Sequence, residues 1–191
     1  MNPTQIAGQI VGLVAAAIMI VSFQFKNTKR LFIIQVCSTV LFTLHYALLG
    51  LGGDSTAFAG MAQNFIGCLF RVVILLSQKN EKLKSTISLT ALCAISTIIA
   101  VLTYNGSIVS LLPTAGNILC MGIYWTEKKN VIRLGQLAVV SPCWLLFNVF
   151  TMSISGIITE SFNIISIIVY YIRMKAGKKD ETGENNNNRQ L

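Results

Sequence analysis

Three ionisable side chains, His45, Arg71 and Glu160, lie inside apolar stretches of this sequence. In such surroundings a charged group usually faces another helix or a water-filled cavity. His45 is the only histidine and belongs to the stretch LFTLHYALLG. Its ring either fixes helix packing through a hydrogen bond to a neighbouring helix, or contacts a substrate or relays a proton near neutral pH.

Glu160 and Arg71 carry opposite charges, and each has two interpretations. Glu160 is either an interfacial carboxylate that faces water, or an acidic gate or proton-coupling site that faces a cavity. Arg71 either extends its long stem through lipid to place the guanidinium at the surface, or anchors an anionic group of a substrate.

Amide side chains add hydrogen-bonding groups to the same apolar stretches. Asn64 and Asn163 occupy corresponding helices in two halves of the chain, where an amide offers donors and an acceptor to a hydroxylated ligand. Asn148 and Trp144 lie one helical turn apart and therefore share a helix face. The candidate substrate-binding residues are Asn64, Asn163, His45, Asn148, Trp144, Glu160 and Arg71.

Prolines and glycines mark places where the helices are expected to bend or to pack closely. Proline removes an intrahelical hydrogen bond, so Pro113, followed by Gly116, and Pro142 are expected to act as hinges. Gly8 and Gly12 form a G-x-x-x-G motif, which allows close helix approach. That motif serves either internal packing or dimerisation, so a homo-oligomer is one of two expectations.

The sequence lacks the short motifs of common enzyme chemistry. It contains no H-E-x-x-H, G-x-S-x-G or P-loop pattern, and its five cysteines show no zinc spacing. A membrane enzyme would need at least two converging catalytic groups, for which only His45 and Glu160 are candidates. We therefore predict no enzyme activity, no catalytic residue, no metal site and no cofactor.

Seven apolar runs separate short, turn-forming segments. Apolar residues make up 53% of the chain and charged residues 12%, against about 25% charged in a soluble domain. A bilayer core takes roughly 20 apolar residues as a helix. The sequence therefore predicts an all-α membrane domain over 1–175, with seven transmembrane helices at about 6–23, 31–51, 56–76, 85–103, 108–125, 131–150 and 157–172.

The basic residues lie almost entirely in alternate loops. Lys and Arg fall between spans one and two, three and four, and five and six, and after span seven; Arg71 is the one exception. Because basic loops stay in the cytoplasm, we expect the N-terminus outside and the C-terminus inside. This placement also explains the net charge of +8 without a nucleic-acid partner. The polar segment 176–191 is expected to be a disordered cytoplasmic tail.

Two segments present similar features in the same order. Arg30 and Arg133 each open a segment with Arg-Leu, and each segment carries Leu-Phe in mid-span and closes on glycine before an acidic residue. We therefore predict two parallel three-helix repeats, at about 6–77 and 108–174, joined by a connector helix at about 85–103. Parallel repeats occur in small transporters, whose binding site lies near the midplane.

Several motifs resemble those of the YgjV family of bacterial inner-membrane proteins: HYALLG at 45–50, LLP with Gly116, Trp144 with Asn148, and SGIITESF at 155–162. The resemblance covers most of the chain outside the tail and is strongest from 108 to 174. It implies a multi-pass protein of the bacterial inner (plasma) membrane, and no particular activity. The three-plus-one-plus-three plan is also similar to the SWEET and PnuC transporters, by architecture alone, since span one has no proline to match Pro113.

These patterns favour one function and leave two rivals. The first hypothesis is a carrier in the lipid bilayer that moves a small polar solute, such as a sugar, nucleoside or vitamin, by alternating access of the two halves. The alternatives are a non-transporting scaffold or sensor that binds partners through its basic loops, and an intramembrane enzyme. A polar cavity between the halves favours the carrier, whereas a filled interior favours the scaffold.

Overall fold

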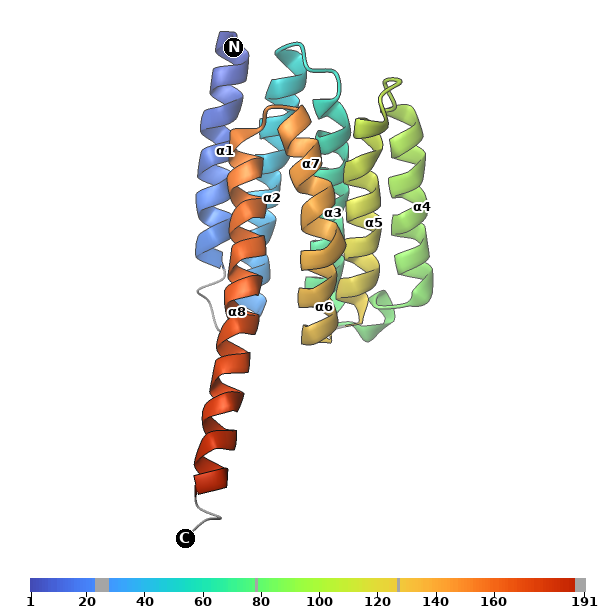
Figure 1. Ribbon diagram of the computed structural model, residues 1–191. Helices are drawn as coiled ribbons and strands as arrows, with labels where there is room; N and C mark the ends of the chain where they lie inside the picture. The colour runs from blue at the N-terminus through green and yellow to red at the C-terminus, as the bar shows by residue number, and fades with distance from the viewer. Residues whose placement is uncertain (23–27, 78, 127, 188–191) are drawn as a thin grey trace.

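The chain folds entirely into helices and short turns over the residues that its structure, a computed structural model, describes: 1–22, 28–77, 79–126 and 128–187 (Figure 1). The α-helices are α1 (Pro3–Ser22), α2 (Thr28–Leu51), α3 (Ala57–Ser77), α4 (Thr86–Leu102), α5 (Leu112–Trp125), α6 (Lys129–Gly135), α7 (Ser141–Phe150) and α8 (Ile154–Asn187). Two 3₁₀ helices, η1 (Glu81–Leu83) and η2 (Ile108–Leu111), and a π-helical segment, η3 (Gln136–Val140), complete them.

These elements make seven apolar crossings, which confirms the all-α fold class. Six helical stretches are long and apolar enough to cross a bilayer, with η2 and α5 forming one and α6, η3 and α7 another. The seventh is α4, an apolar helix of 17 residues. The predicted bounds agree with the helices to within about four residues, except that residue 23 lies outside the described residues.

The helices turn apolar side chains outward and many polar side chains inward. On α4, for example, Ile87 is 80% exposed and Leu102 is 76% exposed. By contrast, His45, Gln63 and Ser153 are fully buried. Exposure of this apolar surface is unfavourable in water and favourable in the hydrocarbon of a bilayer. The buried polar groups must then form hydrogen bonds inside the bundle.

The helices pack as two groups with α4 at one edge (Figure 1). In the first group α2 packs against both α1 and α3, and in the second α7 packs against α5 and α8. Contacts of α1 with α8 and of α3 with α5 join the groups, and α4 packs on α3 and α5. Phe42 of α2 and Phe147 of α7 meet in one buried cluster. The two termini lie at opposite ends of the bundle.

The turns follow local sequence chemistry. Gly53 and Gly106 have positive φ angles of 108° and 86°, which side chains rarely adopt, in the loops LGGDS and YNGS. Ser85 caps α4 because its hydroxyl accepts a hydrogen bond from the Ser88 N–H at 3.2 Å.

Pro113 in the fifth crossing and Pro142 in the sixth each lie next to a break in the regular α-helix. Pro113 occupies the first turn of α5, directly after η2, where its missing N–H costs little. The expected kink in mid-helix is therefore not observed; the proline begins the helix instead. Pro142 occupies the first turn of α7 and follows the π-helical segment η3. That segment interrupts the sixth crossing with wider turns.

The last helix is longer than the sequence suggests. We expected residues 176–191 to be a disordered tail. α8 continues beyond its apolar part as far as Asn187, and residues 188–191 lie outside the described residues, so the expectation for the tail stays a prediction. A helix already nucleated within the bundle extends by one hydrogen bond per added residue, so polar composition alone does not end it.

Candidate functional site

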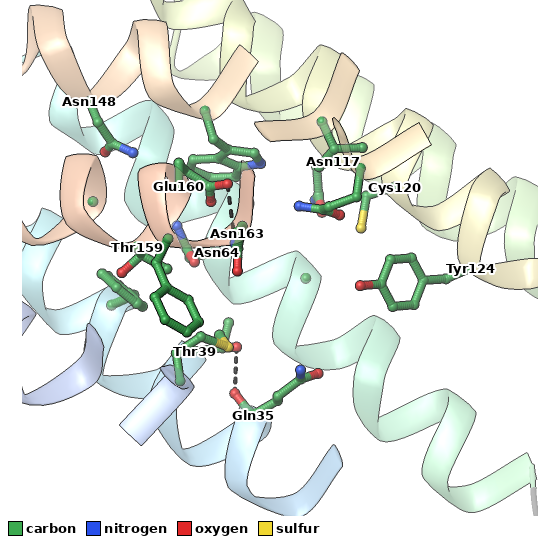
Figure 2. A pocket seen from close by; sticks show the side chains of 18 of the residues that line it. Gln35, Thr39, Asn64, Asn117, Cys120, Tyr124, Asn148, Thr159, Glu160 and Asn163 are labelled. Carbon is green, nitrogen blue, oxygen red and sulfur yellow. Dashed lines mark hydrogen bonds between the residues drawn. The ribbon is translucent and has the colours of Figure 1, made fainter. Parts of the chain in front are cut away.

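A cavity of about 470 Å³, lined by both apolar and polar side chains, lies between the two helix groups. Its volume is within the range of sites for small molecules. Six of the seven predicted binding residues line it, namely Asn64, Arg71, Trp144, Asn148, Glu160 and Asn163, and Figure 2 shows four of these. His45 is not among the lining residues. The interior is therefore hollow, and several of the predicted polar residues line the hollow.

The cavity lies toward the end of the bundle that carries the basic loops. Arg133, Tyr124 and Tyr170 line it at that end. Tyr46 and Asn148 line its opposite end and are 2% and 1% exposed. Beyond them, among the described residues, lie the fully buried side chains of His45, Ser153 and Ser155, which are not part of the cavity lining.

Asn64 and Asn163 present amide oxygens to the cavity. The Asn64 amide group donates to the Gly60 carbonyl at 3.1 Å, and the Asn163 amide group donates to Glu160 Oε2 at 3.3 Å. Both partners are acceptors, so in each amide the NH₂ group faces the protein and the oxygen is left for a ligand.

Asn117 is oriented in the same way by a buried glutamine. Its Nδ2 donates to the Gln63 carbonyl at 3.1 Å and to Gln63 Oε1 at 3.0 Å. The Ser96 hydroxyl also donates to Gln63 Oε1 at 2.6 Å, and Gln63 Nε2 donates to the Ser96 carbonyl at 3.0 Å. This network ties α3, α4 and α5 together and leaves Asn117 Oδ1 as an acceptor on the cavity wall.

Tyr46 and Asn148 close one end of the cavity. The Tyr46 hydroxyl donates to Asn148 Oδ1 at 2.5 Å, joining α2 to α7. The Trp144 ring lies one turn away, 6.3 Å from the Tyr46 ring, and packs on bare backbone at Gly116. A methyl group at Gly116 would approach the indole nitrogen to 3.1 Å, so this glycine provides room for the tryptophan.

Arg71 and Glu160 face the cavity without an ionic partner. Arg71 Nη1 donates to the Gly67 carbonyl at 3.0 Å within α3, and Glu160 accepts hydrogen bonds from the side chains of Asn163 and Ser141. In the described part of the chain, no ion pair joins these two groups to each other or to any other charge. Arg71 and Glu160 therefore lie unpaired in the same cavity, which a second cation, Arg133, also lines.

Arg133 marks the basic end of the cavity. Its guanidinium carbon lies 3.6 Å from the centroid of the Tyr170 ring, a cation–π contact between α6 and α8. Sequence reasoning assigned Arg133 to a cytoplasmic loop and did not single out Tyr170. The charge pattern alone did not show that the two side chains meet at the cavity.

His45 belongs to the packed end beyond the cavity. Its Nδ1 is 2.7 Å from the Gly8 carbonyl, and its Nε2 is 2.8 Å from the Ser153 hydroxyl and 3.3 Å from the Ser155 hydroxyl. A carbonyl only accepts, so Nδ1 carries the proton and Nε2 accepts from serine. The ring thus joins α1, α2 and α8, which matches the packing interpretation, and its partners do not include Glu160.

Gln9 adds further hydrogen bonds at the packed end of the bundle that contains His45. Its Nε2 donates to the Met152 carbonyl at 2.7 Å, and its Oε1 accepts from the Ile154 N–H at 3.1 Å. Met152 has a positive φ of 50°, so Gln9 holds a sharp turn between α7 and α8. Gln9 and His45, from the first helix group, therefore clamp the turn at 151–156 in the second.

Sequence reasoning missed several lining residues, among them Gln35, Tyr46, Asn117, Gln136 and Tyr170. Gln35, Asn117 and Gln136 were visible as polar residues within apolar runs, and that signal alone would have found them. Within the described ranges no three His, Cys, Asp or Glu side chains gather as metal ligands would.

A comparison with protein families shows where the chain belongs. The family model Imp-YgjV, described as a bacterial inner membrane protein, matches residues 6–178. No curated protein and no solved structure matches the chain significantly.

Proposed function

We propose that this chain, which belongs to the YgjV family of bacterial inner membrane proteins, carries a small polar solute across that membrane by alternating access. Its family and its apolar helices place it in the inner membrane as a multi-pass protein. The observation that carries the proposal is the cavity, which is lined in part by polar side chains, lies between two helix groups and is sealed at one end.

The arrangement of the sealed end supports a carrier. Beside the buried cluster of Phe42 and Phe147, the polar contacts that join the two helix groups there are chiefly Tyr46 with Asn148, His45 with Ser153, and Gln9 with Ile154. Hydrogen bonds between membrane helices are worth only about 1 kcal/mol each, so such a seal can open when the groups move apart. We assign no enzyme activity to the cavity.

The proposal includes an internal repeat. Asn64 of α3 and Asn163 of α8 both line the cavity, and Phe42 of α2 and Phe147 of α7 share a buried cluster. These are the pairs expected if α1–α3 corresponds to α5–α8, with α4 as the connector. Pro113, Gly116 and Pro142 remain proposed hinges.

The proposed orientation places the N-terminus outside and the C-terminus in the cytoplasm, because basic residues gather at one end of the bundle. Fusing a compartment reporter to each terminus in turn tests this. We expect cytoplasmic activity only from the C-terminal fusion. Reporters active on the same side would contradict both the orientation and the odd number of crossings.

Labelling of Cys120 tests alternating access. This cysteine lines the cavity, whereas Cys37 is exposed on the outer surface of the helices. In a variant that retains Cys120 alone, a membrane-impermeant maleimide is expected to react at least tenfold faster from the cytoplasmic side, to which the cavity is displaced. A variant that retains Cys37 alone is the matched control and should stay unlabelled from both sides.

Uptake into proteoliposomes, screened over sugars, nucleosides, vitamins and amino acids, tests transport itself. A carrier moves at least one of these solutes down its gradient and, once that solute is found, shows solute-dependent changes in Cys120 labelling. Equal Cys120 labelling from both sides would indicate a channel. Absence of any uptake, with labelling that no solute changes, would favour the scaffold or sensor.

A further inference from the structure

We propose that the cavity binds a small zwitterion, a molecule that carries an ammonium group together with a carboxylate or phosphate group. This inference rests on the proposed function, whose solute it specifies by charge. It starts from the two opposite charges that line the cavity, Glu160 on α8 and Arg71 on α3.

The first step is the balance of charge inside the cavity. Among the described lining residues Glu160 is the only carboxylate, and two cations line the cavity: Arg71, and Arg133, whose guanidinium lies over the Tyr170 ring at the basic end. A ligand that displaces water leaves any unmatched charge in poorly solvated surroundings, which is costly. A cation would leave Arg71 unmatched, an anion would leave Glu160 unmatched, and a neutral sugar would leave both. A zwitterion matches Glu160 and Arg71 at once, while Arg133 keeps its contact with the Tyr170 ring.

The second step is the hydrogen-bonding character around Glu160. The Asn163 NH₂ group is turned toward Glu160 Oε2, which leaves the oxygen of the same amide to accept from a ligand. Figure 2 shows Asn64 pointing toward the same region, and its oxygen is likewise free. A carboxylate flanked by amide oxygens forms an acceptor-rich site, which suits the three N–H donors of an ammonium group.

The third step is the position of the guanidinium. Arg71 folds back along α3, so that a methyl group built on Gly67 would lie 3.1 Å from Arg71 Nη1 and 3.3 Å from Asn117 Oδ1. Gly67 therefore keeps open a space between the arginine and the wall of α5. Gly67 is three residues from Asn64, about 4.5 Å along a helix. The cationic and acceptor-rich sites are thus within reach of one small molecule, and the planar guanidinium fits an oxyanion.

Ligand binding to the full chain in detergent tests the proposal without requiring transport. The probes are L-serine and γ-aminobutyrate, each with its amide as the cation-only form and its N-acetyl derivative as the anion-only form. Phosphoethanolamine, with ethanolamine and ethyl phosphate, distinguishes a phosphate from a carboxylate, and glucose is the neutral probe. The readouts are thermal stabilisation and the fluorescence of Trp144, which lines the cavity. We expect at least one zwitterion to bind tenfold or more tightly than its own single-charge forms and than glucose.

Two variants make the test specific. In Glu160→Gln the anion-only form should bind at least as well as the zwitterion, and in Arg71→Gln the cation-only form should do so. Such opposite changes in preference do not arise from misfolding. Lys82→Gln, in an exposed residue of η1, is the control and should leave the preference unchanged.

The possible results separate this inference from the carrier proposal. If glucose or a single-charge probe binds as tightly as every zwitterion, or if no probe binds, the inference is overturned, while uptake of another solute would leave the carrier intact. If a zwitterion binds with the expected preference but is not taken up into proteoliposomes, the ligand class stands and the carrier proposal fails.

Discussion

Replacing His45 with leucine is expected to lower the free energy of unfolding by about 3 kcal/mol, because two buried hydrogen bonds are lost and a serine hydroxyl loses its acceptor. The side chain is fully buried and bridges the Gly8 carbonyl and the Ser153 hydroxyl. Leucine is similar in size to histidine, so the decrease in the free energy of unfolding measures the lost hydrogen bonds and not the creation of a cavity. Reversible unfolding in increasing SDS measures it.

Two comparisons test the reason for this loss. His45→Gln is matched in size and keeps a donor and an acceptor, so it should retain part of the stability. Ser153→Ala combined with His45→Leu should cost less than the sum of the separate changes, since the two residues share a hydrogen bond. Equal stability of the leucine and glutamine variants would show that the hydrogen bonds do not stabilise the bundle.

Replacing Gly12 with alanine is expected to destabilise the bundle by about 3 kcal/mol or more, because overpacking a filled interior displaces neighbours. The added methyl carbon would lie 2.6 Å from His45 Nδ1 and would also overlap the Ser155 hydroxyl. The added methyl group would therefore disrupt both the helix packing and the hydrogen bonds of His45. Unfolding in SDS and the yield of monodisperse protein measure the effect.

Other glycines of the same chain serve as graded controls. At Gly8 an added methyl would lie 3.1 Å from Leu48 Cβ, so we expect a smaller loss there. At Gly122 nothing lies within 4 Å, so alanine should be neutral or slightly stabilising. An order of damage other than Gly12, Gly8, Gly122 would contradict the packing described here.

The Gly12 result also bears on the two interpretations of the G-x-x-x-G motif. Both glycines pack against α2 of the same chain, at His45 and Leu48. This contact is sufficient to explain the motif by internal packing. The expectation of a homo-oligomer therefore receives no support from these glycines and remains a prediction.

The helices were largely predictable from the sequence because the length and apolar composition of each run are local properties of the chain. A run such as Ala57–Ser77 is long and apolar enough to define a crossing without knowledge of its neighbours. The identity of Glu160, Asn64 and Asn163 as polar residues at membrane depth was equally local. Six of the seven candidate residues line one cavity, in keeping with the tendency of polar groups at membrane depth to face the bundle interior.

Pairings between distant segments were not predictable. His45 meets Ser153, which lies 108 residues later, and no pattern in the sequence specifies that contact. The orientation of Asn117 depends on Gln63 from another helix. The π-helical segment at Gln136–Val140 was missed for a different reason: its sequence QLAVV is compatible with an ordinary helix, and only packing selects the wider turn.

That π-helical segment determines which way the rest of its crossing faces. A π turn accommodates one residue more than an α turn, and in a regular α-helix one residue corresponds to a rotation of about 100°. If the crossing were regular throughout, Trp144 and Asn148 would be rotated by that angle relative to Arg133 at its basic end. The two parts of this crossing could not then both face the same interior space. The rotation that the π-helical segment Gln136–Val140 introduces thus allows a single crossing to contribute side chains at both ends of the cavity.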